Sequence, residues 1–447
     1  MTFMRHARTA SVVAAASGAA VAAIFAACSV NDVSPTNEVD SGTDGAVEAA
    51  DATADVSSFV DVSDAAPPPD VIQDAGLDVG SGFVSISGWD HACAVMGDGG
   101  VACWGNNNYG QSNPSNDAGV LYAPEYFKGL SGATQVSVTL RFSCAVLGNG
   151  TAKCWGLFVN GNWNLQTIQG ADGGVLGGIE KVDVGFGSAG PIVVVKTKTG
   201  DPLCFGGNDL GACSNGGSAV TTTASPMLSA PNTPFTNVKD VAVGQSGQAC
   251  VVSSDGKVHC SGNYPRGDNV VGTIKLASTA QVNASTDFTG AGEINLSYQH
   301  ACAIQASDRS IVNCWGANFT GQLGVPIANG YPPYVEANVG GLTGKVLNVS
   351  TGDQHTCVAL DDGTARCWGA GGAGQLGQGS KSSSATSVAV ANLPSGKKVR
   401  FVEAAGSFSC ATMTDGTAYC WGKGDTGQLG DGQGKQSDTP VQVMAPQ

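Results

Sequence analysis

Pairs of cysteines at a fixed spacing constrain this chain more than any other feature of its sequence. Six pairs recur along the C-terminal four fifths, five with a spacing of ten residues and one with twelve. In five pairs the second cysteine is followed directly by Trp-Gly. The pairs are Cys93 with Cys103, Cys144 with Cys154, Cys250 with Cys260, Cys302 with Cys314, Cys357 with Cys367, and Cys410 with Cys420. Units this short cannot bury a core alone, so the pattern predicts an array or a closed ring of repeats.

A seventh, degenerate unit lies between the second and third pairs. Val194 stands where the first cysteine would be, and Cys204 is the second. With this unit included, successive first positions are 50 to 56 residues apart. High glycine content, few aromatic residues and no long 3.6-residue periodicity favour short strands joined by tight turns. The sequence therefore predicts an all-β fold of seven repeats.

The spacing within each pair predicts a β-hairpin. In the sixth unit, residues 361–363 read Asp-Asp-Gly, with glycine where a three-residue loop needs a left-handed conformation. Such a loop sets Val358 opposite Arg366 and Cys357 opposite Cys367. Residues opposed at a non-hydrogen-bonded site have Cα atoms about 4.5 Å apart, which suits a disulfide. We therefore predict a disulfide across each of the six hairpins.

Cys204 and Cys213 are the remaining cysteines of the repeats, and we predict that they pair with each other. Metal ligation is the alternative for all these cysteines. The ten-residue spacing is wider than that of zinc knuckles, and only three units carry a nearby histidine, namely His91, His300 and His355. We expect these histidines to be structural, donating to a backbone carbonyl between strands. The sequence thus predicts neither a metal site nor a cofactor.

The N-terminus predicts export. Residues 1–28 combine a basic start, an apolar run and a final cysteine, which is the layout of a signal peptide. The end, Phe25–Cys28, resembles the lipobox of bacterial lipoproteins, in which the cysteine is lipidated; an ordinary signal peptide cut nearby is the alternative. We expect a cell-envelope protein held to the membrane only through a lipid on Cys28, as in an outer-membrane lipoprotein. Otherwise the protein is expected to be secreted or periplasmic.

An acidic linker, residues 29–81, separates this signal from the repeats. It holds twelve Asp or Glu, no Lys or Arg, and Phe59 as its one aromatic residue, which predicts disorder. Most of the chain's net charge of −15 belongs to it, so residues 82–447 are nearly balanced. Since no basic stripe is present, nucleic acid is excluded as a partner.

The order of the strands predicts how a ring would close. Each hairpin follows a short apolar alternation, and an extended run that often begins with proline comes before that, as at Pro333. The chain ends on such a run, Pro440–Val443. We therefore predict that the C-terminal strand completes the sheet of the first unit and removes an exposed edge.

Together these units resemble the repeats of the regulator-of-chromosome-condensation family, which form seven-bladed β-propellers. The shared features are a Gly-x-x-His start, an Asp-Gly turn, Trp-Gly and a Gly-Gln-Leu-Gly tail, as in residues 352–377. The resemblance covers about residues 82–447. A cysteine before Trp-Gly departs from the eukaryotic relatives and is similar to an exported bacterial branch with a disulfide in each blade.

Two functions are compatible with this resemblance. The favoured one is a monomeric protein-binding or scaffold propeller without catalytic activity, whose partner is an unknown protein or cell-surface polymer. Its candidate binding residues lie in irregular loops: Trp163, Tyr264, Tyr331 and Tyr334. The alternative is an extracellular hydrolase or lyase acting on a polymer such as a glycan. No catalytic motif supports it, and two carboxylates converging in an axial pocket would revive it.

Overall fold

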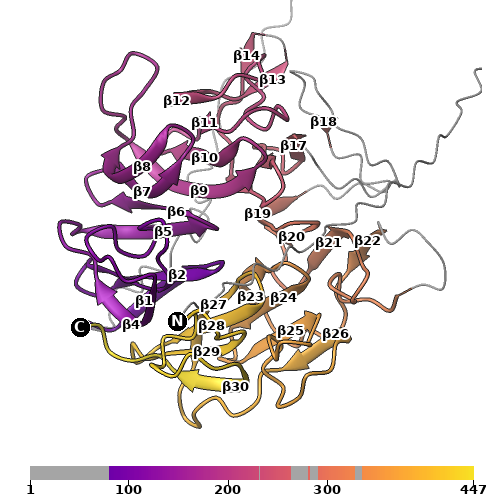
Figure 1. The fold of residues 1–447 in the computed structure, drawn as a ribbon. Helices are drawn as coiled ribbons and strands as arrows, with labels where there is room; N and C mark the ends of the chain where they lie inside the picture. The colour runs from indigo at the N-terminus through magenta and orange to yellow at the C-terminus, as the bar shows by residue number, and fades with distance from the viewer. Residues whose placement is uncertain (1–79, 231, 263–279, 282–289, 328–334) are drawn as a thin grey trace, which may run out of the picture. The chain divides into compact units, whose positions relative to one another are not determined.

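A computed structural model describes residues 80–447 except 231, 263–279, 282–289 and 328–334. Every regular element in this part is a β-strand, and the strands form seven four-stranded sheets arranged as blades around a common axis (Figure 1). In each blade the chain runs from the innermost strand to the outermost. The described residues contain no helix that could cross a membrane. The predicted all-β, seven-bladed propeller is confirmed.

The strands of each blade follow one another along the chain. Blade 1 has β1 (Phe83–Gly88), β2 (His91–Met96), β3 (Val101–Asn106) and β4 (Val120–Tyr126). Blade 2 has β5 (Ala133–Thr139), β6 (Phe142–Leu147), β7 (Ala152–Phe158) and β8 (Gly161–Thr167). Blade 3 has β9 (Ile179–Gly187), β10 (Gly190–Thr197), β11 (Pro202–Gly206) and β12 (Thr221–Pro226), followed by the small pair β13 (Leu228–Ala230) and β14 (Thr233–Pro234).

The remaining blades repeat this order. Blade 4 has β15 (Asp240–Val243), β16 (Gln248–Val252), β17 (Val258–Gly262) and β18 (Ala280–Gln281). Blade 5 has β19 (Ala291–Leu296), β20 (His300–Gln305), β21 (Val312–Gly316) and β22 (Val335–Asn338). Blade 6 has β23 (Val346–Thr351), β24 (His355–Leu360), β25 (Ala365–Gly369) and β26 (Ser384–Ala389). Blade 7 has β27 (Val399–Ala404), β28 (Phe408–Met413), β29 (Ala418–Gly422) and β30 (Ser437–Gln442).

The hairpins and disulfides match the sequence prediction. In blade 6, Val358 lies opposite Arg366 and Cys357 opposite Cys367. All six hairpin pairs form disulfides, with Cα atoms 4.0 to 4.1 Å apart. The bonded pairs are Cys93 with Cys103, Cys144 with Cys154, Cys250 with Cys260, Cys302 with Cys314, Cys357 with Cys367, and Cys410 with Cys420.

Blade 3 forms its disulfide outside the hairpin. Val194 lies opposite Cys204 in the register of β10 and β11, so the hairpin offers no second thiol. Cys204 bonds Cys213 instead, across a Cα separation of 5.2 Å, as the sequence predicted. A disulfide therefore stands in every blade.

The glycine of each Trp-Gly motif has a steric reason. Gly156 has a φ of +102°, and a Cβ there would lie 2.4 Å from the backbone oxygen of Arg141. Gly369 in blade 6 has a φ of +104°, and a Cβ would lie 2.4 Å from the oxygen of Gln354. Since both the conformation and the close approach exclude a side chain, only glycine fits after the tryptophan.

The predicted strand exchange at the end of the ring is wrong. The last strand, β30, pairs with β29 of its own blade, and β1 to β4 already complete blade 1. The extended run before each inner strand is the outermost strand of the preceding blade, so every blade comes from one continuous stretch. The ring still closes. The backbone N–H of Gln447 donates to the Pro124 oxygen at 3.1 Å, and Trp104 packs with Leu429 and Val443 in one core cluster.

A hydrogen bond from the Trp-Gly tryptophan joins many neighbouring blades. The indole Nε1 of each of four tryptophans donates to the backbone oxygen of a glutamine in the preceding blade, at 2.8 to 2.9 Å. The pairs are Trp155 with Gln111, Trp368 with Gln322, Trp421 with Gln375, and Trp104 with Gln428. We call this contact the Trp–Gln latch. It also explains the Gly-Gln-Leu-Gly tail, whose glutamine supplies the acceptor.

Candidate functional site

Polar side chains of the innermost strands join each blade to the next around the axis. The free edge of an innermost strand exposes backbone N–H groups that require acceptors. In six of the seven blades, the side chain at one shared position of the innermost strand accepts from an N–H of the following blade at 2.9 to 3.2 Å. These side chains are Ser87, Ser137, Asp183, Asn295, Ser350 and Glu403. Ala242 occupies the equivalent position of blade 4, and there Asp240 accepts from the Ile294 N–H of blade 5 instead, at 2.9 Å. These axial side chains therefore act as structural caps.

The axial carboxyl groups take part in this capping. Asp183 accepts from Ser137 Oγ and from the N–H groups of Val184 and Val243. Desolvation raises the pKa of Glu403 to about 8, although hydrogen bonds from Ser350 and the Gly88 N–H act in the opposite direction. Desolvation raises the pKa of Asp183 as well. These shifts arise from enclosure in the axis, and each of the two groups already has protein partners.

Two ion pairs complete the axial cluster. Lys181 pairs with Asp240, whose other carboxylate oxygen accepts from the Ile294 N–H at 2.9 Å. Burial opposes protonation of Lys181, yet the nearby carboxylates of Asp240 and Asp183 raise its pKa. Glu293 pairs with Arg309 at 3.1 Å. The carboxylates that converge on the axis are thus held by backbone amides and cations, which gives each a structural role.

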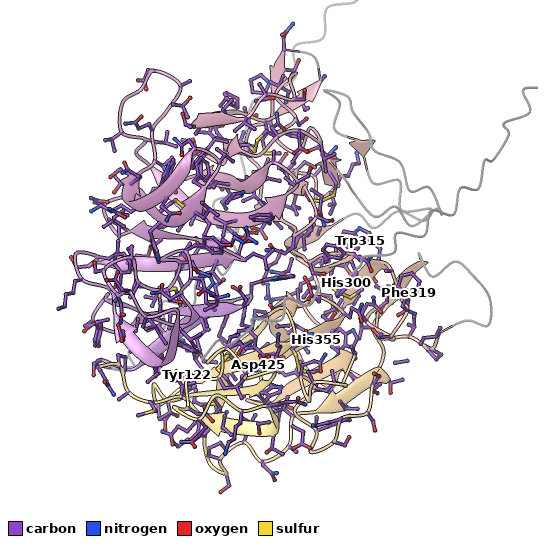
Figure 2. The ribbon with its side chains drawn as sticks, in the orientation of Figure 1. Tyr122, His300, Trp315, Phe319, His355 and Asp425 are labelled. Carbon is purple, nitrogen blue, oxygen red and sulfur yellow. A yellow bond between two sulfur atoms is a disulfide. The ribbon has the colours of Figure 1, made fainter. Side chains whose placement is uncertain are left out.

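The three histidines that precede a first cysteine also link blades. His91 Nε2 lies 2.7 Å from Ser143 Oγ of the next blade, and that hydroxyl donates to the Gln111 backbone oxygen. His300 contacts Thr356 and His355 contacts Ser409 in the same way, at 2.8 and 2.9 Å, and both histidines are labelled in Figure 2. The expected structural role is confirmed, but the direct partner is a hydroxyl, where we had expected a carbonyl.

These histidines are unsuited to metal binding or proton transfer. His300 and His355 have no exposed surface, and burial lowers the pKa of each to about 3. They are therefore neutral at physiological pH. Within the described residues, no group of three or more His, Cys, Asp or Glu side chains is placed to hold a metal ion.

The two faces of the propeller differ in chemistry. One, which we call the hairpin face, carries the turns between second and third strands. Each such turn is closed by a short polar side chain: Asp362 Oδ1 accepts from the Thr364 N–H at 2.8 Å, and Asp415 Oδ1 from the Thr417 N–H at 3.0 Å. These turn aspartates therefore have a structural role.

The opposite face, which we call the Trp-Gly face, carries the turns between first and second strands and the connections between third and fourth strands. Tyr298 and Phe319 project there from blade 5, with exposed fractions of 47% and 40%. Trp89 and Tyr109 are half-buried on the same face, and Arg141 lies over the Tyr109 ring at 4.6 Å. Aromatic and arginine side chains of this kind are typical anchors of protein interfaces.

The structure places only some of the candidate residues predicted from the sequence. Trp163 on β8 is half-buried: its ring packs on Phe158 at 4.2 Å, and its Nε1 donates to Asn160. Tyr264, Tyr331, Tyr334 and Cys28 lie outside the described residues. Sequence reasoning missed Tyr298 and Phe319. Their signal was an aromatic residue in a turn position that is polar or small in most other units.

Comparisons with known proteins agree on the repeats. Family profiles described as Regulator of chromosome condensation (RCC1) repeat match residues 84–111, 346–375 and 415–447. The human E3 ubiquitin-protein ligase HERC2 is 30% identical over 213 residues, which is 46% of this chain but 4% of HERC2. The ultraviolet-B receptor UVR8 of Arabidopsis thaliana is 29% identical over 154 residues, 34% of each protein. The chain thus matches less than two thirds of these relatives.

Solved structures show the same fold. Human WBSCR16 superposes with a TM-score of 0.63 at 17% identity, covering 77% of this chain and 94% of that one. Prp20p of Saccharomyces cerevisiae, a protein studied for binding Gsp1p and histones, gives 0.59 at 14% identity, covering 81% and 88%. Repeat profiles, blade topology and these neighbours point to one conclusion. The chain carries regulator of chromosome condensation (RCC1) repeats and folds as a seven-bladed β-propeller.

Proposed function

We propose that this protein is an exported, surface-tethered binding propeller that recognises a protein partner through its Trp-Gly face. The observation that carries the proposal is the exposed pair Tyr298 and Phe319 on that face. The regular parts of the repeat are used inside the fold, in disulfides, latches and axial caps. The connections on this face are where the blades differ, and loops held by a rigid scaffold commonly carry binding residues.

Export and tethering are supported by two features. Seven disulfides are consistent with an oxidising compartment such as the cell exterior. The sequence of residues 1–28 predicts a signal peptide that ends in a lipidated Cys28. Radiolabelled palmitate should therefore enter the full chain and fail to enter a Cys28→Ala variant. An unlabelled, freely secreted wild-type protein would remove the tether from the proposal.

Site-specific cross-linking tests the binding face. A photoreactive phenylalanine analogue at position 319 of the full chain should capture one protein on intact cells of the source organism. The matched control is position 122, where Tyr122 has a similar exposed fraction of 46% but lies on β4. We expect the captured band at 319 to be absent at 122 and to weaken with Tyr298→Ser. Equal capture at both positions, or no specific band at 319, would contradict binding through this face.

A further inference from the structure

A polar cavity of about 380 Å³ opens on the Trp-Gly face between blades 5, 6 and 7. Its walls are the turns between first and second strands of these three blades, together with Gln375 from the connection between β25 and β26. Two of the turns end at His300 and His355, which Figure 2 labels. Besides Gly406, the lining side chains are one aromatic ring, three amides, one carboxyl and one hydroxyl: Tyr298, Gln299, Gln354, Gln375, Asp353 and Ser407. Its volume lies within the range of about 300 to 1,000 Å³ that is usual for small-molecule sites.

The carboxyl group of Asp353 differs from the carboxyls of the axis. The axial groups accept from backbone amides, whereas no described residue donates a hydrogen bond to the Asp353 side chain; only its N–H is bonded, to the Gly406 oxygen at 3.0 Å. The charge of Lys423 lowers the pKa of Asp353 through space, but its Nζ pairs with Asp425 instead, at 3.5 Å. Burial raises the pKa of Asp353 to about 6, as expected for a carboxyl without a close partner.

Gln375 presents the complementary group. Its side chain lines the cavity, and the residue is only 5% exposed. Its Oε1 accepts from the Ala373 N–H at 2.9 Å, while its Nε2 donates to none of the residues that the structure describes. This Nε2 faces the cavity, where a ligand or water can accept from it. The cavity therefore offers an unpaired acceptor and an unpaired donor.

Hydroxyl groups match this combination, because each can donate and accept. One hydroxyl of a sugar would donate to Asp353, and its neighbour would accept from Gln375 Nε2. The exposed ring of Tyr298 offers an apolar face for the C–H face of a pyranose, and the other amides and Ser407 add hydrogen-bonding groups. A simple cation would leave Gln375 Nε2 unpaired, and an anion would be repelled by Asp353. We propose that this cavity binds a neutral sugar residue of an extracellular glycan, a function beyond the proposed protein recognition.

Saturation-transfer NMR with the full chain tests this proposal. The probes are glucose, galactose, mannose and N-acetylglucosamine, each at millimolar concentration. We expect at least one to receive saturation, and Asp353→Asn, Gln375→Glu and Tyr298→Ala each to weaken its binding about tenfold or more. Gln375→Glu keeps the acceptor that Ala373 uses, removes the donor and adds a negative charge to the cavity that Asp353 lines. Tyr122→Ala is the control. It deletes a ring about as exposed as that of Tyr298, on β4 and outside the cavity lining, and it should bind as wild type.

Three results would overturn the proposal. In the first, no probe binds a wild-type protein whose melting curve shows it to be folded. In the second, the bound sugar is indifferent to Asp353→Asn and Gln375→Glu. In the third, N-acetylarginine amide binds in an Asp353-dependent way while every sugar fails, which would make the cavity a site for a basic side chain. Capture at position 319 does not use the sugar probes, so failure of one proposal leaves the other measurable.

Discussion

The seven interfaces between blades fall into two sets that lie in two arcs of the ring. Four consecutive interfaces, from blade 5 round through blade 1 to blade 2, have the Trp–Gln latch. The three interfaces between blades 2 and 5 do not. Blade 3 has Phe205 in place of the tryptophan, blade 4 has Ser261, and Trp315 of blade 5 has no partner for Nε1 among the described residues.

The comparison shows that donors and acceptors change together. Blade 2 continues from β7 directly into β8 and has no glutamine loop to offer an acceptor, and the next blade has Phe205, which has no N–H to satisfy. At the following interface Ser261 Oγ donates to the Ala212 oxygen at 2.6 Å, a shorter form of the same contact. We call the three interfaces without the latch, between blades 2 and 5, the irregular arc. Because a lost acceptor there is matched by a lost or shortened donor, this arc avoids most of the unpaired buried groups that independent substitutions would leave.

Disulfides are shared by both arcs, so their reduction should have the largest effect. Each closes a short loop and contributes about 2 to 3 kcal/mol, so seven together match or exceed the stability of about 5 to 15 kcal/mol typical of a domain. We expect full reduction to unfold the propeller, as followed by circular dichroism together with mass spectrometry of alkylated thiols. A fully reduced chain that keeps its native spectrum would show that the latches and caps suffice.

The latch itself gives the next largest effect. Trp421→Phe removes the donor to the Gln375 oxygen and should lower the free energy of unfolding by about 1 to 3 kcal/mol in urea titrations. Trp315→Phe is the matched variant from the irregular arc. Because Trp315 Nε1 has no partner among the described residues, its loss should cost less. Equal costs for the two variants would mean that the indole ring, and not the hydrogen bond, provides the stability.

The sequence predicted the parts of this fold that are local. Turn chemistry around Asp362 set the hairpin register, and the register set the disulfides. The ring closure was predicted wrongly, because an extended run such as Pro440–Val443 carries no mark of which neighbouring hairpin it pairs with. The axial caps were beyond sequence reasoning for a related reason. Ser87 and Val138 are 51 residues apart, and only the closed ring brings them together.

The cavity shows the same limit. Asp353 and Gln375 belong to different connections of blade 6, and Ser407 belongs to blade 7. In the repeat pattern Gln375 reads as part of the Gly-Gln-Leu-Gly tail, and its backbone oxygen does serve the latch. Its side chain acquires a second role only where it meets the turn of the next blade. A position with a clear structural reason can therefore hide a candidate binding group.

The axial caps at two neighbouring interfaces differ in whether they can ionise. These are the interface between blades 7 and 1 (interface 7/1) and the interface between blades 6 and 7 (interface 6/7). Glu403 caps blade 1 with a carboxyl, whereas Ser350 caps blade 7 with a hydroxyl that does not titrate. The pKa of Glu403 rises from 4.5 to about 8 on folding, so the folded state holds this proton more tightly. The stabilisation that protonated Glu403 gives to the folded state is complete below pH 4.5 and is lost as the pH rises through about 8.

Glu403→Gln should therefore raise the melting temperature relative to wild type in alkaline buffer by a few degrees, and by less in mildly acidic buffer. Melting curves of both proteins across this range give the comparison, and the acidic end serves as the internal control. A difference that stays constant with pH would show that the carboxyl titrates alike in the folded and unfolded chain.

The smallest effect we predict is a coupling between two side chains. His355 and Ser409 face each other at interface 6/7, while Phe408 and Ala92 hold the equivalent positions at interface 7/1. Ser409→Ala alone should cost about 1 to 2 kcal/mol, because it leaves the buried His355 Nε2 without its partner. Adding His355→Phe recreates the apolar pair found at the neighbouring interface, so the double variant should recover about 1 kcal/mol of that loss. Urea titrations of the wild type, both single variants and the double variant measure this coupling. Additive costs would show that histidine and hydroxyl are stabilised separately, and that the matched residues at the two interfaces do not act as pairs.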